Sequence, residues 1–563
     1  MKIAIAQMNC TVGDLAGNGS RIVDFAMRAR AQGADVMVTP ELALCGYPPE
    51  DLLLRDDFYR NCEKALRAIA SKITGITVVV GFPQQVDGKR FNAAAVMQSS
   101  RVMAVYHKHA LPNYTVFDEE RYFDADDQPC VFDINGSKVG VNICEDTWGS
   151  QGPLLAASAV SRAELSSGSF TLTRDWDAAA PRAARAAGAE ILLVLNASPY
   201  HLRKQHSRYD VMRARVSENG MPLIYANMVG GQDELVFDGA SFVLNRAGEV
   251  THQLSMFKEA LAIITIEDGD PVKGEVAPER TVEAEVYDAL CLGVRDYVTK
   301  NGFPGVLLGL SGGIDSALTV AVAADALGAD KVHAVMMPSQ YTASMSREDA
   351  CAEADALKVR YSEIAIRPMY DAFMAALAPQ FDGLPADTTE ENLQSRIRGT
   401  LLMAMSNKSG AIVLTTGNKS EMGTGYATLY GDMAGGFAVL KDISKMLVYR
   451  LASYRNTLSP VIPQRVITRA PSAELRPDQT DQDNLPPYAV LDAIMEAYVE
   501  HNASPRDIEA AGYERKDIER VIRLLRISEY KRRQAPIGIR ITSRGFGKDW
   551  RYPVTTKYRD RFD

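Results

Sequence analysis

A glycine-rich loop near the middle of the chain carries residues whose types and spacing suit phosphate chemistry. It lies within residues 306–327, VLLGLSGGIDSALTVAVAADAL. The apolar run before the loop is typical of a buried strand, and the alanine-rich run after it favours a helix. Gly312 and Gly313 let the backbone approach a ligand, Ser311 and Ser316 add hydroxyl donors, and a helix N-terminus attracts anions. The pattern predicts a phosphate-binding loop.

Asp315 sets this loop apart from the common nucleotide loops. The loop has neither the lysine of GxxxxGK[ST] nor the spacing of GxGxxG. A carboxylate beside a phosphate needs a cation between them, so we expect Mg²⁺ bound by Asp315 and nucleotide oxygens. In a parallel sheet, ligands lie at the carboxyl ends of the strands, where we expect Met337, Thr416 and Asn418. Glu421, five residues beyond Thr416, is the candidate second metal-binding carboxylate.

A second set of reactive side chains lies in the front half of the chain, each directly after an apolar run. Glu41 follows ADVMVTP, Lys108 follows RVMAVYH, and Cys144 follows SKVGVNI. In layered α/β folds, the ends of strands usually carry the chemistry. Amide hydrolysis needs a nucleophile, a base that takes its proton, and a positive charge for the oxyanion. Cysteine, glutamate and lysine supply these three functions, so we predict amide hydrolysis here.

The elements around these residues alternate between strand-like apolar runs and helical runs throughout the chain. In the front half we expect helices near residues 20–32 and 59–71. Residues 267–280 contain two prolines, two glycines and many charges, a composition typical of a linker. We therefore predict an α/β protein of two domains, residues 1–270 and 271–563, the second with a doubly wound parallel sheet.

The overall composition excludes several classes of function. The 563 residues carry a net charge of 62 − 71 = −9 without an aromatic-basic repeat, so we expect no nucleic-acid partner. Apolar runs are shorter than the roughly 18 residues that a membrane span requires, and the start does not resemble a signal peptide. We expect a cytoplasmic protein without a membrane partner. The seven cysteines form no CxxC pairs, which argues against a zinc site or a disulfide framework.

The loop GLSGGIDS resembles the pyrophosphate loop of the ATP pyrophosphatases, which adenylate a substrate oxygen and release pyrophosphate. The resemblance implies that ATP is a co-substrate and that Mg²⁺ accompanies it. The residues assigned to ATP are Gly309, Leu310, Ser311, Gly312, Gly313, Ile314, Asp315, Ser316, Met337 and Thr416.

Three segments of the front half, PELALCGYPPEDLL, HKHALPNY and NICEDTW, resemble the nitrilase superfamily. The resemblance implies an α/β/β/α sandwich and a catalytic triad of Glu41, Lys108 and Cys144. The auxiliary glutamate of the family matches Glu119 in VFDEERYF.

Glutamine is the amide that this resemblance implies. The glutamine-binding positions of the family match Tyr114, Ser198 and Lys204. A glutamine pocket must bind an α-carboxylate and an α-ammonium at once, and a cation with hydroxyl donors suits the carboxylate. Arg203 and Arg208 are alternatives to Lys204.

Two segments resist assignment to a role. Residues 227–241, NMVGGQDELVFDGAS, look like glutaminase strands of the family, but we assign them no catalytic role. Residues 150–174 are rich in serine, alanine and glycine, and relatives usually lack them. We interpret them as a surface insertion; the alternative is a flap that controls glutamine entry or contacts another subunit.

Residues 415–442, TTGNKSEMGTGYATLYGDMAGGFAVLKD, resemble the segment of NAD synthetases that binds ATP and the deamidated dinucleotide. The resemblance implies that Asp432 and Lys441 flank the pyridine carboxylate and that Glu421 binds metal. The residues assigned to the dinucleotide are Asn392, Glu421, Asp432, Lys441 and Lys531.

Taken together, the resemblances imply that glutamine hydrolysis supplies ammonia for amidation of nicotinic acid adenine dinucleotide (deamido-NAD⁺) to NAD⁺. Ammonia in water is mostly protonated, so a shielded passage between the sites is expected, as in relatives. The resemblance also implies a homo-oligomer, because such coupling usually involves oligomers in this family. Other amidating pyrophosphatases fit less well: asparagine synthetases use a cysteine at position 2, which here is Lys2, and GMP synthetases use a GxCxG elbow that is absent. A tRNA-modifying enzyme would need a basic or zinc-bearing module. A non-catalytic nucleotide-binding protein is the remaining alternative.

Overall fold

The computed structural model describes residues 1–148, 178–472, 474–476, 485–560 and 562. The described residues up to Arg280 form one compact unit, and a second compact unit begins at Thr281. The segment 150–174, interpreted above as an insertion or flap, lies outside the described residues.

The first unit contains two large sheets. The seven-stranded sheet has the order β15 (Asp270–Pro271), β14 (Ala260–Glu267), β1 (Lys2–Gln7), β2 (Val36–Val38), β3 (Thr77–Val86), β4 (Lys89–Gln98) and β5 (Arg101–His107). The six-stranded sheet has the order β13 (Val250–Gln253), β12 (Phe242–Leu244), β9 (Leu223–Asn227), β8 (Ile191–Asn196), β7 (Ser137–Ile143) and β6 (Cys130–Ile134). A hairpin of β10 (Val229–Gln232) and β11 (Leu235–Asp238) stands apart from both.

Alternation along the strands explains why the sheets stack. In β1, Ile3 and Ile5 belong to the apolar cluster between the two sheets, whereas Ala4 and Ala6 belong to the cluster on the outer face. Because side chains of a strand point alternately to opposite faces, each sheet has two buried faces and needs cover on both.

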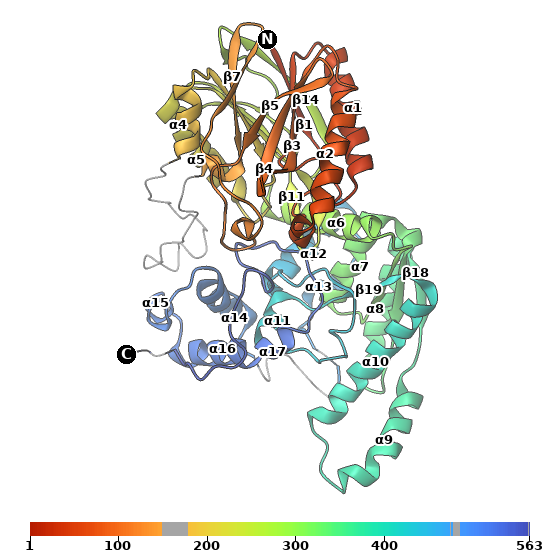
Figure 1. Cartoon of the computed structure of the whole chain (residues 1–563). Helices are drawn as coiled ribbons and strands as arrows, with labels where there is room; N and C mark the ends of the chain where they lie inside the picture. The colour runs from red at the N-terminus through yellow and green to blue at the C-terminus, as the bar shows by residue number, and fades with distance from the viewer. Residues whose placement is uncertain (149–177, 473, 477–484, 561, 563) are drawn as a thin grey trace. The chain divides into compact units, whose positions relative to one another are not determined.

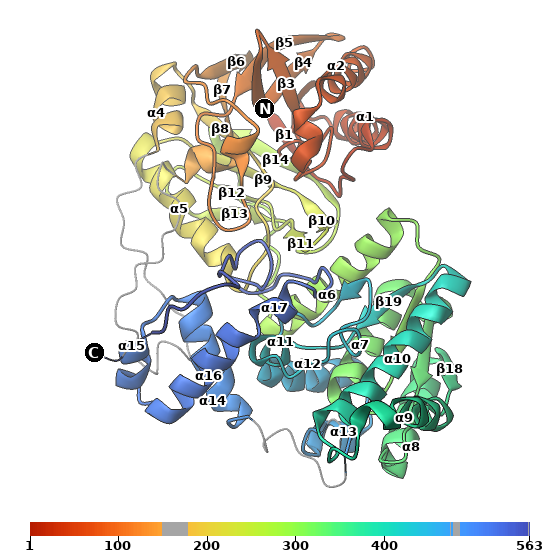
Figure 2. The ribbon, with the colours of Figure 1, turned by 60° about the horizontal axis from the view of Figure 1, so that its bottom comes forward.

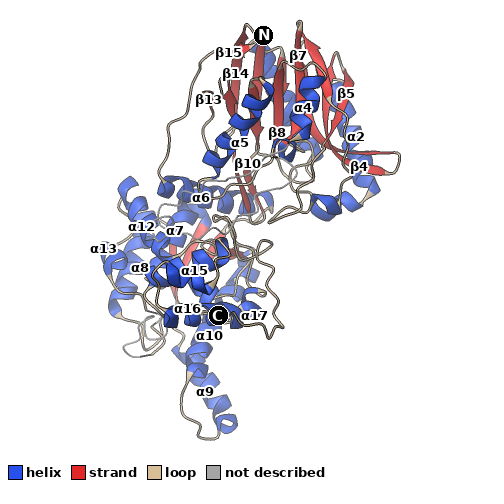
Figure 3. Ribbon diagram, turned by 90° about the vertical axis from the view of Figure 1, so that its left-hand side faces the viewer, coloured by secondary structure: helices blue, strands red, loops and turns tan. Residues whose placement is uncertain are grey.

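Helices supply the outer cover. Figure 1 shows α1 (Leu15–Ala31) and α2 (Asp56–Ala70) on one side of the strands and α4 (Ala179–Ala186) and α5 (Lys204–Asn219) on the other. Figure 3 shows the strands of this unit in red, next to one another and with helices packed around them. The predicted α/β/β/α sandwich is therefore confirmed.

The second unit is built on a five-stranded sheet in which every pairing is parallel. Its order is β18 (Arg360–Glu363), β17 (Val332–Met336), β16 (Val306–Gly309), β19 (Ile412–Thr415) and β20 (Phe437–Ala438). The chain starts in the middle, winds to one edge and then to the other, so the direction of winding reverses between β16 and β19. This is the doubly wound fold predicted from the sequence, and ligands of such sheets bind at the point of reversal.

Helices surround this sheet (Figure 2), and they are α6 (Val282–Lys300), α7 (Ile314–Leu327), α8 (Ser344–Leu357), α10 (Thr388–Ser409) and α12 (Lys445–Leu458). In Figures 1 and 3, α9 (Arg367–Phe381) extends away from the sheet of its unit, and none of its residues is buried.

The C-terminal part of the second unit is helical. α14 (Tyr488–Met495), α15 (Pro505–Ala510) and α16 (Arg515–Ile527) lie together in Figure 2 around an apolar cluster that includes Leu491, Ile518 and Val521. A π-helical turn, Glu496–Glu500, follows α14, and α17 (Glu529–Arg532) follows α16.

None of the helices in the described part of the chain combines the length and the apolar character needed to cross a bilayer.

Candidate active site

Cys144 lies at the point where β7 ends and a short 3₁₀ helix, Cys144–Thr147, begins. Its φ of 42° is in the left-handed region, which is uncommon for a residue with a side chain and typical of functional turns. The thiol is buried, and burial raises its pKa well above the usual range. At rest the sulfur is therefore protonated, so a nucleophilic role requires a neighbouring base.

The predicted base and cation are in direct contact. Lys108 Nζ donates to Glu41 Oε1 at 2.7 Å, and both side chains are almost fully buried. Glu41 also accepts from Asn92 Nδ2 at 2.7 Å and from the Ala197 backbone N–H at 3.0 Å. Donors on three other segments of the chain thus fix the orientation of the Glu41 carboxylate.

Glu119 completes this cluster. Lys108 Nζ donates to both of its oxygens, at 3.0 and 2.8 Å, and the Tyr47 hydroxyl donates to Oε1 at 2.8 Å. Burial raises the pKa of Glu119, which Lys108 counteracts in part. Burial alone would lower the pKa of Lys108, but Glu119 and Glu41 raise it well above its usual range. The site therefore keeps a permanent cation between two carboxylates.

Tyr114, predicted to contact glutamine, donates its hydroxyl to Glu145 Oε2 at 2.8 Å. Glu145 follows the nucleophile directly and is buried. Burial raises the pKa of Glu145 to about 7, while the bond from Tyr114 opposes the rise. A buried carboxylate beside Cys144 suits the α-ammonium of an amino acid.

The structure distinguishes the three candidate cations of the glutamine pocket. Lys204 begins α5, and its Nζ lies 4.5 Å from the centre of the Trp148 ring. Arg203 precedes the helix in a left-handed conformation. Arg208 is fully buried in an ion pair with Asp238, at 2.7 Å, so its charge is already balanced.

In the second unit, the phosphate loop joins β16 to α7. Gly312 has a φ of 77°, and a Cβ there would lie 2.2 Å from the Ser346 carbonyl oxygen, so this position requires glycine. Ser311 Oγ accepts from the Gly313 N–H at 3.2 Å and lies 3.0 Å from Ser316 Oγ. The loop is therefore shaped by its own hydroxyls at the start of a helix.

Asp315 and Glu421 are brought together by a lysine that our sequence analysis missed. Lys445 Nζ lies 2.6 Å from Asp315 Oδ2 and 3.4 Å from Glu421 Oε1. Asn418 Nδ2 donates to the other Asp315 oxygen at 2.8 Å. Two carboxylates that converge on one cation fit a divalent ion whose further ligands come from nucleotide and water. Thr416 follows β19 directly, so it lies at the same end of the sheet.

Of the residues assigned to the dinucleotide, Glu421 lies beside Lys445 as described above, and the other four fall into two groups. Thr428 connects the first group, since its Oγ donates to Asn392 Oδ1 at 3.0 Å and its N–H to Asp432 Oδ1 at 2.6 Å. Lys531 Nζ donates to the carbonyl oxygens of Gly425 and Ala427, both at 2.8 Å. Met337, assigned to ATP, is buried one residue beyond β17.

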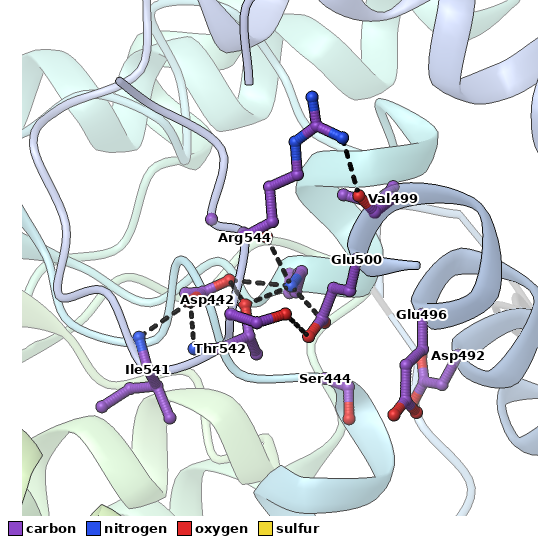
Figure 4. Close-up of polar contacts among 12 residues, drawn as sticks. Asp442, Ser444, Asp492, Glu496, Val499, Glu500, Ile541, Thr542 and Arg544 are labelled. Atoms are coloured by element: carbon purple, nitrogen blue, oxygen red, sulfur yellow. Dashed lines mark hydrogen bonds and ion pairs between the residues drawn. The ribbon is translucent and has the colours of Figure 1, made fainter. Parts of the chain in front are cut away.

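Lys441 forms the second group, on a turn after β20, and its Nζ donates to the Pro536 carbonyl oxygen at 2.6 Å. The next residue, Asp442, accepts from the backbone N–H groups of Ile541 and Thr542 at 2.8 and 2.7 Å (Figure 4). Lys419 Nζ lies 2.9 Å from Asp442 and 2.8 Å from Glu500. A buried ammonium thus ties the turn to α11 (Lys419–Thr424) and to the π-helical turn.

The residues that sequence reasoning missed, Asn92, Tyr47 and Lys445, share one property. Each meets its partner across a long stretch of chain, such as the 130 positions between Lys445 and Asp315. Asn92 and Lys445 lie outside the quoted motifs, and Tyr47 lies within PELALCGYPPEDLL, where the sequence analysis singled out only Glu41. Their polar character within otherwise apolar or turn segments was the signal available.

Comparison with known families explains why two such sites occur in one chain. A model of the carbon-nitrogen hydrolases matches residues 2–164 and 168–270, and a model of NAD synthase matches residues 286–535. The chain is therefore a carbon-nitrogen hydrolase unit joined to an NAD synthase unit.

Full-length relatives have the same pairing. The chain is 49% identical to the glutamine-dependent NAD(+) synthetase of Acinetobacter baylyi, with 99% of each chain covered. It is 42% identical to that of Thermotoga maritima, with 100% of this chain and 99% of the relative covered. The chain belongs to the glutamine-dependent NAD(+) synthetase family. It is an enzyme, a ligase that forms carbon–nitrogen bonds, as predicted from the sequence.

Solved structures agree at the level of the fold. The structure of the glutamine-dependent NAD⁺ synthetase from Acinetobacter baumannii in complex with ADP is 45% identical, covers 98% of both chains and has a TM-score of 0.75. That from Cytophaga hutchinsonii is 20% identical with a TM-score of 0.81, which shows the fold alone.

Proposed function

We propose that this chain converts deamido-NAD⁺ to NAD⁺ with ATP and glutamine as co-substrates. The observation that carries the proposal is the buried Glu41–Lys108–Glu119 cluster in a chain that also contains the Asp315–Lys445–Glu421 cluster at the phosphate loop. We assign glutamine hydrolysis to residues 1–270 and amidation to residues 271–563. The spans of the two family models, which end at residue 270 and begin at residue 286, support this assignment, although the first compact unit extends further, to Arg280.

Glutamine hydrolysis begins at the protonated Cys144. Glu41 takes the thiol proton, the sulfur attacks the side-chain amide carbon, and the proton passes to the departing ammonia. Lys108 stabilises the oxyanion of the tetrahedral intermediate. Glu41 then activates water, which hydrolyses the thioester to glutamate. Glu119 keeps Lys108 charged throughout, since two carboxylates hold one ammonium.

Recognition of the amino acid divides between two sides of the pocket. Glu145, with Tyr114, receives the α-ammonium, and Lys204 with Ser198 receives the α-carboxylate. Lys204 fits this role better than Arg208 because the Arg208 guanidinium is already bound by the Asp238 carboxylate. Opposite charges on the two sides select an amino acid over a simple amide.

Amidation begins with adenylation of the pyridine carboxylate. The phosphate loop and Lys445 bind the anionic oxygens of ATP, and Asp315 with Glu421 would hold Mg²⁺, which supplies charge neutralisation as pyrophosphate leaves. Asn392, Asp432, Lys441 and Lys531 bind the dinucleotide in this proposal. Ammonia from the first unit then displaces AMP. Transfer along a shielded route remains part of the proposal, supported by the presence of both activities in one chain.

A homo-oligomer and a reducing location complete the proposal. α9 carries Tyr370, Phe373, Met374 and Leu377 at helical spacing, and Phe373 is 49% exposed. An apolar helix face with this exposure suits contact with a second copy. All seven cysteines are free, which suits the reducing cytoplasm.

The proposal is tested with glutamine labelled with ¹⁵N in its side-chain amide. The protein is incubated with ATP, Mg²⁺ and deamido-NAD⁺, and the product is identified by mass. We expect NAD⁺ that carries the label, together with AMP, pyrophosphate and glutamate. Failure to consume deamido-NAD⁺ while another acid is amidated would overturn the acceptor assignment.

A further inference from the structure

The segment 227–241, which received no role from the sequence, contains two buried polar side chains, Asn227 and Asp238, and Asn227 contacts Ser198. Asn227 ends β9 and Asp238 ends β11, and both side chains are fully buried. A buried carboxylate is costly unless it is paired and hydrogen-bonded, so the environment of Asp238 requires an explanation.

Arg208 of α5 is the partner of Asp238. Its Nη1 and Nη2 donate to the two carboxylate oxygens at 2.7 and 2.9 Å, a planar two-bond pairing, and both side chains are at most 1% exposed. The pairing fixes the plane of the guanidinium, so the remaining N–H groups point in defined directions.

Those remaining donors reach Ser198. Arg208 Nη2 donates to the Ser198 carbonyl oxygen at 2.8 Å, and Nε and Nη2 each lie 3.3 Å from Ser198 Oγ. Asn227 accepts from the Ser198 N–H at 3.0 Å. Backbone and side chain of Ser198 are therefore both held by buried groups.

This arrangement sets the polarity of the Ser198 hydroxyl. A guanidinium has donors and no acceptor, so Ser198 Oγ accepts from Arg208 and donates its own proton to another group, either the Tyr225 hydroxyl or a bound carboxylate. A hydroxyl held as a donor suits an anionic group such as a carboxylate. The neighbouring residue, Ala197, donates its N–H to Glu41 at 3.0 Å, so the same short turn holds the base and the hydroxyl.

We propose that the Arg208–Asp238 pair is a positioning device for glutamine, which presents the Ser198 hydroxyl as a donor to the α-carboxylate. Arg208 does not itself bind the substrate, because Asp238 already balances its charge. The inference rests on the proposed function, in which Ser198 contacts glutamine, and it names the groups that determine how tightly glutamine binds.

The test uses Asp238→Asn, which removes the charge with little change in shape, and Arg208→Lys, which keeps a charge but loses the planar pairing. In the full-length protein we expect the KM for glutamine to rise by about tenfold, the effect of one lost hydrogen bond to a charged group. We expect kcat for glutamine hydrolysis to change by less than about threefold. Two readouts should stay unchanged: synthesis with ammonium salts, and the rate at which iodoacetamide alkylates Cys144.

Arg215→Lys is the matched control, because Arg215 is also buried on α5 but pairs with Glu218, at 2.9 Å. Its KM for glutamine should remain that of the unchanged protein. Ser198→Ala should raise the KM as Asp238→Asn does, and the double variant should show no further rise.

The outcomes separate the possible failures. If Ser198→Ala raises the KM and neither Arg208→Lys nor Asp238→Asn does, the positioning inference is wrong. Slower alkylation of Cys144 in the pair variants would also overturn it, since the pair would then act on the nucleophile. If Ser198→Ala leaves the KM unchanged, the role of Ser198 in the proposed function fails instead.

If Asp238→Asn does not fold, the KM of Arg208→Lys alone tests the inference. If Arg208→Lys does not fold either, the pair is structural and the inference is overturned.

Discussion

At the scale of single residues, burial changes what each group can do. Lys108 lies between Glu41 and Glu119 with no measurable exposure of its side chain, so its charge is fixed by two carboxylates rather than by water. A lysine held in this way stabilises an oxyanion without exchanging its proton. Burial raises the pKa of Cys144 well above its usual range, so in the proposed mechanism the thiol depends on Glu41 for activation.

Replacement of Cys144 should separate the two half-reactions. We expect Cys144→Ala to reduce glutamine-dependent synthesis by more than about 1,000-fold, because no other group forms the thioester. Synthesis from ammonium salts should be retained, since it does not need the thioester. Both rates are measured as NAD⁺ formed per minute. Normal use of glutamine by this variant would refute the triad assignment.

Asp315→Asn should have the complementary effect. Loss of one carboxylate from the pair around Lys445 weakens binding of a divalent ion, and we expect synthesis with either nitrogen donor to fall by about 100-fold. Hydrolysis of glutamine to glutamate, measured alone, is the internal control and should continue. Equal loss of both activities would indicate a folding defect and would remove the support for a metal role.

The raised pKa of Glu145 predicts that glutamine binding depends on pH. Its pKa is raised from 4.5 to about 7, so its charged form appears only as the pH passes about 7. Since the charged form attracts the α-ammonium, we expect the KM for glutamine to fall between pH 6 and 8, on the order of one unit either side of that pKa. In Glu145→Gln the KM should be high and independent of pH. A profile shared by both proteins would assign the ionisation to another group.

The raised pKa of Glu145 also makes folding stability depend on pH, and this dependence runs opposite to that of glutamine binding. The folded protein binds the proton of Glu145 more tightly than the unfolded chain does. The stability from this group is therefore fully present below pH 4.5 and is lost as the pH rises through about 7. Glutamine binding improves in the range where this contribution to folding disappears.

At the scale of elements, the turn after β20 connects two functional groups. Lys441, assigned to the dinucleotide, and Lys445, beside Asp315, lie only four positions apart, and Asp442 between them forms an ion pair with Lys419. A short turn fixed by a buried ion pair can keep two cations at a constant separation. In the proposed function, the placement of both substrates in the second unit therefore depends on this turn.

Loss of the Lys419 ammonium should destabilise the second unit. Lys419→Met leaves the buried carboxylates of Asp442 and Glu500 without their shared cation, and we expect a loss of about 3 kcal/mol. Calorimetry should show a lower Tm for the transition of this unit. Lys516→Met is the control, because Lys516 has 76% of its side chain exposed and should leave the Tm unchanged. An unchanged Tm for Lys419→Met would show that the ion pair contributes little.

At the scale of the whole molecule, the apolar face of α9 predicts self-association. Phe373 is 49% exposed and Leu384, in the following turn, is 73% exposed. We expect Phe373→Asp to shift the protein to a smaller species in light scattering coupled to size exclusion, because a charge cannot be buried unpaired in an apolar contact. Arg367→Asp, on the same helix at a polar position, is the control. Identical masses for all three proteins would place the contact elsewhere or exclude it.

The sequence by itself determined the local structures that carry the chemistry. The phosphate loop follows from its glycines and from the alanine-rich helix after it, and both domains follow from the alternation of strand and helix patterns. Where the local sequence pattern is weak, the observed ends of a helix differ from the predicted ones. α1 begins at Leu15 rather than near Ser20, because the Asp14 side chain caps it and its first turns contain Gly17 and Gly19, which disfavour a helix in isolation.

Only the tertiary structure decided which residues act together. Tyr47 is hydrogen-bonded to Glu119, which is 72 residues away in the sequence. The corresponding separations are 51 residues for Asn92 and Glu41 and 30 residues for Arg208 and Asp238. Such contacts arise because strands, loops and helices from distant parts of the chain pack together, and no periodicity in the sequence indicates which residues will be in contact. Residue types indicated the chemistry that was available, and packing determined the charge and direction of each group.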